Sequence, residues 1–168
     1  TVTPKLANAI LWANEAGAGG HQVASNDAPP AFRHSLIDGS GGSSNWTSGL
    51  GTDEGGNIDA DPLLVDTSAT DFRPQEDSPV LDAGLNGALP ADTTDLDADG
   101  DSTETLPWGL ADSTRVTDAN GDGTATVNMG AYEAVGPDLT PLAAPGTVAI
   151  TAFTDSLRVG WTAVADGD

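Results

Sequence analysis

Apolar residues in this chain occur in short runs that are separated by turns rich in Gly, Asn, Asp and Ser. Few stretches keep the 3.6-residue period of an amphipathic helix, and 21 Gly and 11 Pro are spread along the 168 residues. Because Gly and Pro interrupt helices and mark turns, the pattern predicts an all-β protein made of short strands. Residues 5–15 have the composition of a short helix, but an internal repeat favours a strand there.

Three of the apolar runs align as an internal repeat. Residues 8–12 match residues 34–38 at an offset of 26. A third copy covers residues 62–66, and its Leu63 follows Leu36 at an offset of 27. One set of strands per roughly 20–30 residues is typical of a solenoid, in which stacked rungs bury their apolar side chains in a continuous core. The alternative is three unrelated strands of a β-sandwich.

The C-terminal part of the chain has a different pattern. Residues 135–145 contain several Pro and form a predicted linker. After it, apolar and small or polar residues alternate over residues 148–151 and again over residues 157–161. This period of two predicts two half-buried strands that are joined by a turn at residues 154–156.

The charge of the chain excludes some classes of partner. There are 26 acidic residues against five basic ones, which gives a formal net charge of −21. Nucleic acid and anionic membrane surfaces both need clustered basic residues, and the chain has no such cluster. No apolar run approaches the roughly 18 residues that span a bilayer, so we expect no membrane insertion. The absence of Cys excludes disulfides and thiolate metal sites.

The acidic residues are strongly biased towards Asp, with 21 Asp against five Glu. A general need for surface charge would use both residue types. Asp is the residue of turns and of cation-binding loops, so the bias favours a loop-rich calcium protein. A halophilic surface is the alternative.

Two segments with Asp or Asn at alternate positions are the candidates for a metal site: the first acidic ladder (residues 95–101) and the second acidic ladder (residues 118–123). Alternate carboxylates with a nearby Gly converge on one point while the backbone turns, as Ca²⁺ loops require. The first ladder lacks the bidentate Glu of an EF-hand at its twelfth position, although Glu104 is near. The alternative is a solvated acidic turn, or for the second ladder a plain Asn-Gly turn. The predicted Ca²⁺ ligands are Asp95, Asp97, Asp99, Asp101, Asp118, Asn120 and Asp122.

Six motifs follow one another in a characteristic order. They are Asn8–Asn14, Ser35–Ile37, Gly56–Asp66, Asp71–Pro74, Ser78–Gly84 and Met129–Glu133. Together they resemble the C-terminal end of bacterial right-handed parallel β-helix surface proteins, the choice-of-anchor Q group. The resemblance covers residues 5–134 and implies an exported protein whose β-helix ends in a cap. Both acidic ladders lie in an expansion that this family pattern lacks, so the calcium prediction rests on the ladders themselves.

The C-terminal strands resemble the first two strands of a fibronectin type III domain, which has about seven strands. Two strands cannot bury Trp161 within their own domain, so we expect them to dock on the preceding module or to be completed by another chain. The predicted organisation has the last β-helix rungs over residues 1–58, a capping region with calcium loops over 59–134, the linker over 135–145 and truncated fibronectin strands over 146–168. Both ends of the chain look cut, which indicates a piece of a longer protein.

These features predict a non-enzymatic, calcium-stabilised structural or adhesive portion of an extracellular bacterial surface protein. A polysaccharide lyase or glycoside hydrolase is the alternative, since many parallel β-helices act on acidic polysaccharides. The candidates for the basic residue of a lyase are Lys5, Arg33 and Arg73, and none lies in a recognisable motif. The net charge also repels an anionic glycan, which argues against a lyase site in this portion.

Two further alternatives concern partners. A carbohydrate-binding module would stack sugars on Trp12, Trp46 or Trp108, and its partners would be cell-surface or environmental glycans. A subunit of a polymeric extracellular filament would instead join like chains by strand addition at exposed strand edges.

Overall fold

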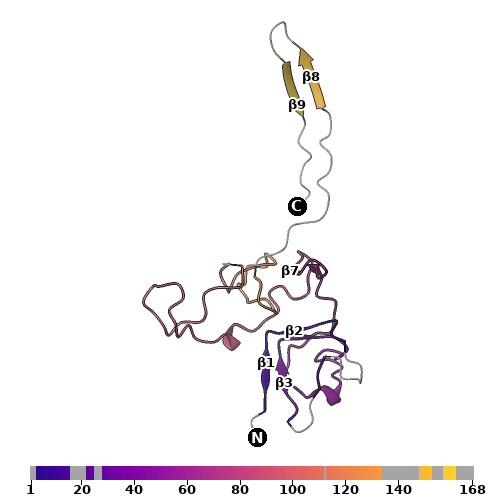
Figure 1. Ribbon diagram of the computed structural model, residues 1–168, viewed down its shortest axis with the longest axis vertical. Helices are drawn as coiled ribbons and strands as arrows, with labels where there is room; N and C mark the ends of the chain where they lie inside the picture. The colour runs from indigo at the N-terminus through magenta and orange to yellow at the C-terminus, as the bar shows by residue number, and fades with distance from the viewer. Residues whose placement is uncertain are drawn as a thin grey trace. The chain divides into compact units, whose positions relative to one another are not determined.

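The computed structural model of the chain describes residues 3–15, 22–24, 28–111, 113–133, 148–152 and 157–161, the last two segments by their backbone only. The chain divides into two compact units, Thr1–Pro137 and Asp138–Asp168 (Figure 1). Within the described residues the regular elements are nine short strands and two short 3₁₀-helices, with no α-helix. The all-β class predicted from the sequence is confirmed.

Parallel strands from successive segments stack in the first part of the chain. Strands β1 (Lys5–Ala7), β3 (Ala31–Arg33) and β5 (Thr52–Asp53) form a parallel sheet in the order β1-β3-β5. Strands β2 (Ile10–Leu11) and β4 (Leu36–Ile37) form a second parallel pair. Ile10 lies opposite Leu36, so the alignment of the first two repeat copies at an offset of 26 is confirmed.

The third copy of the repeat does not stack as predicted. Strand β6 (Leu64–Asp66) pairs antiparallel with β7 (Asp71–Pro74) in a local hairpin. The Asp66 carboxylate accepts the backbone N–H groups of Ser68 and Ala69 at 3.0 and 3.1 Å, which fixes the turn between the two strands. This local turn chemistry outweighs the apolar pattern, and the third parallel strand is the polar β5 instead.

The backbone turns sharply at equivalent places in the stacked segments. Asn8 and His34, which are aligned in the repeat, have φ angles of +54° and +43°, and Gly56 in the next segment has +70°. The Asn8 N–H donates to the His34 carbonyl at 3.0 Å. A Cβ atom at position 56 would lie 2.7 Å from the His34 ring, so both the positive φ and the close approach require Gly there.

The core of the first unit lies where later segments cover the second parallel pair. Leu36, Val80 and Met129 form a buried cluster against which Ile10 and Ile58 pack. The Met129 N–H donates to the Val80 carbonyl at 3.0 Å, which joins two segments that are far apart in the chain. The two 3₁₀-helices, η1 (Ser48–Leu50) and η2 (Asn86–Ala88), bury none of their residues. The fold therefore depends on a small core and on many loop hydrogen bonds.

The second unit contains one antiparallel hairpin. Strands β8 (Val148–Ala152) and β9 (Leu157–Trp161) pair with Val148 opposite Trp161, so the two strands predicted from the alternating pattern are confirmed. The predicted turn at 154–156 and the linker at 135–145 lie outside the described residues. Docking of this hairpin, or its completion by another chain, stays a prediction. In the part of the chain that the structure describes, no helix has the length and apolarity needed to cross a membrane.

Candidate metal centre

The first acidic ladder sits in a loop whose two ends are joined by backbone pairing. Ala91 and Thr105 form an antiparallel bridge, and the Asp92 N–H donates to the Glu104 carbonyl at 2.8 Å. The Leu106 N–H also donates to the Pro90 carbonyl at 3.0 Å. The acidic residues between these positions are therefore confined to one closed loop.

The closed loop brings carboxylates together in two overlapping groups. Asp95, Asp97 and Asp99 each offer one oxygen, and these oxygens all lie within 4.8 Å of one another. Asp97 also forms such a group with Asp92 and Glu104. The three ion pairs among the described residues lie elsewhere, so none of these pairs neutralises either group. Both groups could hold a metal ion.

Local backbone geometry explains why the ladder side chains converge. Asp95, Ala98 and Gly100 have positive φ angles of 53°, 60° and 91°, so the chain changes direction repeatedly over a few residues. The Gly100 N–H donates to Asp95 Oδ1 at 3.2 Å, and the Asp99 N–H points to Asp97 Oδ1 at 3.4 Å. Asp tolerates the left-handed region and forms such Asx turns, which is the physical basis of the predicted loop.

Two acidic residues outside the predicted ligand set belong to the site. Asp92 is fully buried, and its carboxylate accepts the Leu96 N–H at 2.7 Å and the Thr94 N–H at 3.3 Å, so it also anchors the loop. Glu104 has a buried oxygen, Oε1, without a hydrogen-bond partner. Burial raises the pKa of Glu104, and the nearby carboxylates led by Asp97 raise it further. Glu104 was considered from the sequence, whereas Asp92 was missed because it lies outside the alternating spacing.

Asp101 belongs to neither group. Its Oδ1 accepts the Thr103 N–H at 2.8 Å and the Thr103 hydroxyl at 2.6 Å. These hydrogen bonds hold the pKa of Asp101 below its usual value because they favour the charged carboxylate. Of the four predicted ligands in the first ladder, three are therefore assembled in one group.

The second acidic ladder makes backbone hydrogen bonds like those of the first but does not gather three carboxylates. Asp118 accepts the N–H groups of Asp122 and Gly123 at 3.0 and 2.8 Å, and Asn120 Oδ1 accepts the Asp122 N–H at 2.9 Å. Asp122 in turn accepts the Thr124 N–H at 2.8 Å. No group of three acidic or His side chains forms here among the described residues. The predicted ligands Asp118, Asn120 and Asp122 thus share one loop, which their own hydrogen bonds to the backbone hold together.

Two contacts of residues outside the ladder fix the second loop on the body of the protein. The Asp82 carboxylate accepts the N–H groups of Ala119 and Asn120 at 3.1 and 2.8 Å. Arg115 and Glu133, which flank the loop in sequence, form a largely buried ion pair at 2.5 Å. The sequence carried no signal for either contact, because Asp82 and Arg115 lie outside the alternating pattern.

The environment of Glu133 has opposing electrostatic effects. Burial raises the pKa of Glu133 to about 7, while the Asn128 N–H and the Arg115 charge act in the opposite direction. The Asn128 N–H donates to Glu133 Oε2 at 2.9 Å, and Arg115 also donates to the Gly130 carbonyl at 2.8 Å. The ion pair and these two hydrogen bonds connect Arg115, before the second loop, to residues 128–133 after it. We call the Arg115–Glu133 pair the clamp.

Two of the basic residues considered for a lyase are engaged in ion pairs. Lys5 Nζ lies 2.9 Å from Glu54, and Arg73 lies 2.6 Å from Asp71. Asp71 raises the pKa of Arg73, mainly through its hydrogen bond, so this guanidinium is held in its charged form. Neither residue has the setting of a general base, which must be able to accept a proton.

Comparison with known proteins gives no relative for this chain: no family model, no curated protein and no solved structure matches it. Its function has to be argued from the geometry of the described residues. The most specific feature of that geometry is the convergence of carboxylates in the first ladder.

Proposed function

We propose that this chain is a non-enzymatic structural portion of an extracellular bacterial surface protein, ordered by Ca²⁺ at its acidic loops. The observation that carries the proposal is the group formed by Asp95, Asp97 and Asp99, whose oxygens lie within 4.8 Å of one another. The negative charges of these carboxylates repel one another at this separation. A cation bound between them attracts all three and offsets that repulsion.

The oxygen of Glu104 supplies a second argument for a cation. Oε1 is buried without a hydrogen-bond partner, and Glu104 forms a group with Asp92 and Asp97. A buried acceptor without a partner is unfavourable, and a metal ion beside it would remove that penalty. Because Asp97 belongs to both groups, it is the central ligand of the proposed site.

Calcium fits the donor set better than other common metals. Every candidate ligand is an oxygen, whereas Zn²⁺ and Cu⁺ favour the nitrogen and sulfur of His and Cys. Mg²⁺ requires a near-ideal octahedron, but Ca²⁺ accepts about 6–8 oxygens in irregular geometry, which suits an exposed loop.

The parallel strands support the finer proposal that the first unit contains terminal rungs of a right-handed β-helix. β1, β3 and β5 stack in parallel, with Lys5 opposite Ala31 and Ala31 opposite Thr52. The repeat length of about 20–30 residues is that of a solenoid. Val80 and Met129 bury Leu36, as residues of a cap at the end of such a solenoid would. The hairpin β8–β9 fits the first strands of a fibronectin type III domain.

The test is the effect of Ca²⁺ on thermal unfolding, followed by circular dichroism. About 5 mM Ca²⁺ should raise the melting temperature by about 5 °C, because a ligand that binds only the folded state stabilises it. EDTA should remove the effect, and Mg²⁺ should reproduce little of it. Asp97→Asn should abolish the shift, whereas Asp77→Asn removes the same charge from an exposed position outside both ladders and should retain it. A melting curve that Ca²⁺ leaves unchanged would refute the proposal.

A further inference from the structure

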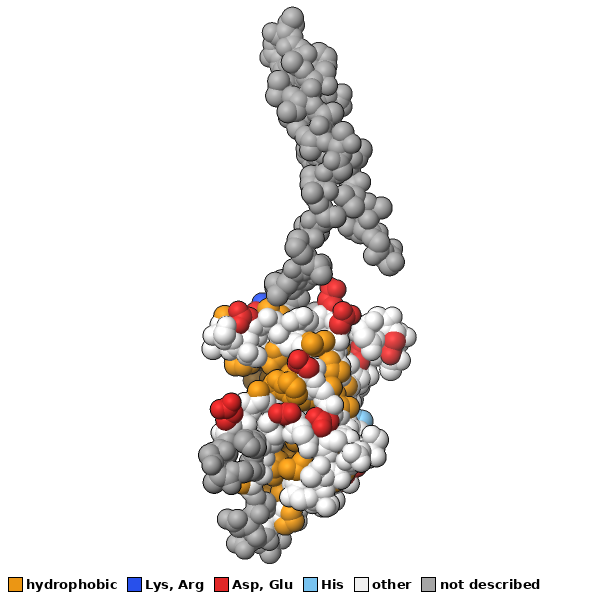
Figure 2. Space-filling view, turned by 90° about the vertical axis from the view of Figure 1, so that its right-hand side faces the viewer, with side chains coloured by type: hydrophobic (Ala, Val, Ile, Leu, Met, Phe, Trp, Pro, Cys, Tyr) orange, Lys and Arg blue, Asp and Glu red, His pale blue; other side chains and the backbone are white. Residues whose placement is uncertain are grey.

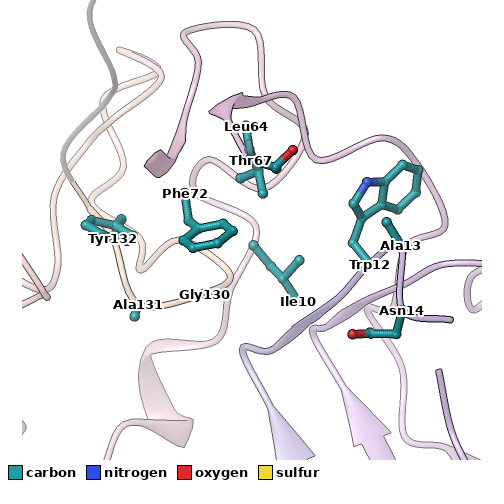
Figure 3. Close-up of a pocket in the computed structure, with 10 residues that line it drawn as sticks. All are labelled: Ile10, Trp12, Ala13, Asn14, Leu64, Thr67, Phe72, Gly130, Ala131 and Tyr132. Carbon is teal, nitrogen blue, oxygen red and sulfur yellow. The ribbon is translucent and has the colours of Figure 1, made fainter. Parts of the chain in front are cut away.

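A pocket of about 560 Å³ opens on the first unit, away from the acidic ladders. Its wall comes from three segments that are distant in sequence: residues 10–14 around β2, residues 64–72 of the β6–β7 hairpin, and residues 130–132 near the end of the unit (Figure 3). The volume falls within the range of about 300–1,000 Å³ that is usual for small-ligand sites. None of its ten lining residues belongs to a predicted calcium loop.

The pocket presents aromatic surface to solvent. Trp12, Phe72 and Tyr132 all line it, each from a different segment. Figure 3 shows Phe72 beside Ile10 in the middle of the group, with Tyr132 on one side and Trp12 on the other. Phe72 is 48% exposed, which is high for a Phe ring in a small folded unit.

A glycine shapes the floor of this pocket. Gly130 has a φ of +95°, and a Cβ atom there would lie 2.9 Å from Ile10 Cδ1. The Gly130 N–H donates to the Asn8 carbonyl at 2.7 Å, which holds the 130–132 segment against the stacked strands. Because no side chain projects from this position, the hollow between Ile10 and Tyr132 is kept open.

The described residues that line the pocket carry no charge, although the chain as a whole has a net charge of −21. Figure 2 shows acidic side chains spread around an exposed area of apolar side chains on one face of the molecule. Within the pocket, the polar side chains besides the Tyr132 hydroxyl are the amide of Asn14 and the hydroxyl of Thr67. An anionic ligand would be repelled by the surrounding field, and a cationic one would find no carboxylate in the lining.

We propose that this pocket binds a neutral sugar ring. A pyranose has an apolar C–H face that packs on aromatic rings and a rim of hydroxyl groups that pair with amides and hydroxyls. Phe72 and Tyr132 supply the aromatic surface, and the hydroxyls of Thr67 and Tyr132 and the side-chain oxygen of Asn14 supply the polar partners. The amide nitrogen of Asn14 already donates to Gln22 at 2.6 Å. A purely apolar ligand would cover the Thr67 hydroxyl without offering it a hydrogen-bond partner. This site would add recognition of neutral glycans to the structural role, and it can fail without affecting the calcium proposal.

The direct test is NMR titration of the full chain with neutral methyl glycosides of glucose, galactose, mannose and N-acetylglucosamine and their β-linked disaccharides. The chain has four Trp, so four indole N–H signals report on four places, and Trp12→Phe assigns the one at the pocket. At least one neutral probe should shift the Trp12 signal saturably at millimolar concentrations, while the other indole signals stay in place. Galacturonic acid should cause no shift, because its carboxylate is repelled.

Two matched variants complete the test. Phe72→Ala removes a half-exposed ring and should weaken binding about tenfold or more, whereas Leu110→Ala removes a 62%-exposed side chain that does not line the pocket and should leave binding unchanged. Thr67→Val keeps the side-chain shape, should retain the fold and should also weaken binding. The proposal is overturned if no neutral saccharide shifts Trp12, or if Phe72→Ala binds as tightly as the original chain. It is equally overturned if dilution alone shifts the Trp12 signal, which would make the pocket a contact between two copies.

Discussion

The two acidic ladders have nearly the same sequence pattern but different electrostatics. In both, the first Asp accepts an N–H from the Gly five residues later, Gly100 in one and Gly123 in the other. The first ladder nevertheless gathers three carboxylates that form no ion pair with any basic side chain the structure describes. Side chains of both ladders accept backbone N–H groups, but the second ladder contains only two carboxylates, with Asn120 between them.

The second loop is also fixed from outside by the protein's own groups. Asp82 holds two of its N–H groups, and the Arg115–Glu133 pair ties together residues that flank it. The first loop has the buried Asp92 as an anchor, but that anchor adds negative charge to the group. We therefore expect the first loop to depend on a bound metal more strongly than the second.

The largest effect is expected from removal of the clamp beside the second loop. Above pH 7, where Glu133 is ionised, Arg115→Met leaves this buried carboxylate without its cation, and breaking a buried ion pair in this way costs about 3–5 kcal/mol. Urea unfolding should show this loss with and without Ca²⁺. Lys5→Met, which breaks the exposed pair with Glu54, is the control and should change stability by about 0.5 kcal/mol or less. Equal losses in the two variants would mean that Arg115 is no clamp.

A pH effect of the same pair should be somewhat smaller. The pKa of Glu133 rises from 4.5 to about 7 on folding, so the folded state binds more protons than the unfolded state between these values. The stability contributed by protonated Glu133 is therefore complete below pH 4.5 and is lost as the pH rises to about 7. Each pKa unit corresponds to about 1.4 kcal/mol before solvent screening, which reduces it. Glu133→Gln should flatten this slope in urea unfolding at several pH values; an unchanged slope would assign it to other groups.

The contact of Asp82 with the second loop should come next in size. Asp82→Ala removes a charged acceptor from two backbone N–H groups and should cost about 1.5–3 kcal/mol. Amide hydrogen exchange should accelerate at Ala119 and Asn120 and stay unchanged at Gly100 in the first ladder. Acceleration in both loops would show that their stabilities are coupled, contrary to the distinction drawn between them.

The smallest stability effect, and the sharpest contrast between the loops, is expected in Ca²⁺-free buffer. Asp97→Asn relieves repulsion in the first group and should raise the melting temperature by about 2 °C. Asp122→Asn should lower it slightly, because the Asp122 carboxylate accepts the Thr124 N–H. Differential scanning calorimetry can resolve the two signs. The same sign in both variants would remove the proposed difference between the ladders.

The hydrophobic pattern of the sequence was sufficient to predict part of the strand stacking. The apolar pairs Ile10–Leu11 and Leu36–Ile37 stack as predicted because both lie in short strands bounded by turn residues. Leu63 and Leu64 have the same apolar signal, yet the turn made by Asp66 directs them into a hairpin. The partner of β3 on its other edge is the polar Thr52–Asp53, which no apolar pattern could identify. Tertiary hydrogen bonds, rather than local pattern, decide such pairings.

The sequence predicted where the site lies in the chain better than it predicted which residues contact one another there. The alternating Asp residues located the first ladder and three of its assembled ligands. Sequence spacing could not distinguish Asp101, whose carboxylate accepts two hydrogen bonds from Thr103, from the neighbouring Asp residues of the group. It also gave no signal for Asp92, because the contribution of Asp92 arises from closure of the loop between Ala91 and Thr105. Long-range closure of this kind is visible only in the folded chain.

Diffraction from crystals of the full chain grown with Ca²⁺ would test the central claim most directly. We predict a density peak beside Asp95, Asp97 and Asp99, with about 6–8 oxygen neighbours at about 2.3–2.6 Å and an anomalous signal consistent with calcium. A first ladder that is well ordered and holds no ion in such crystals would contradict the claim.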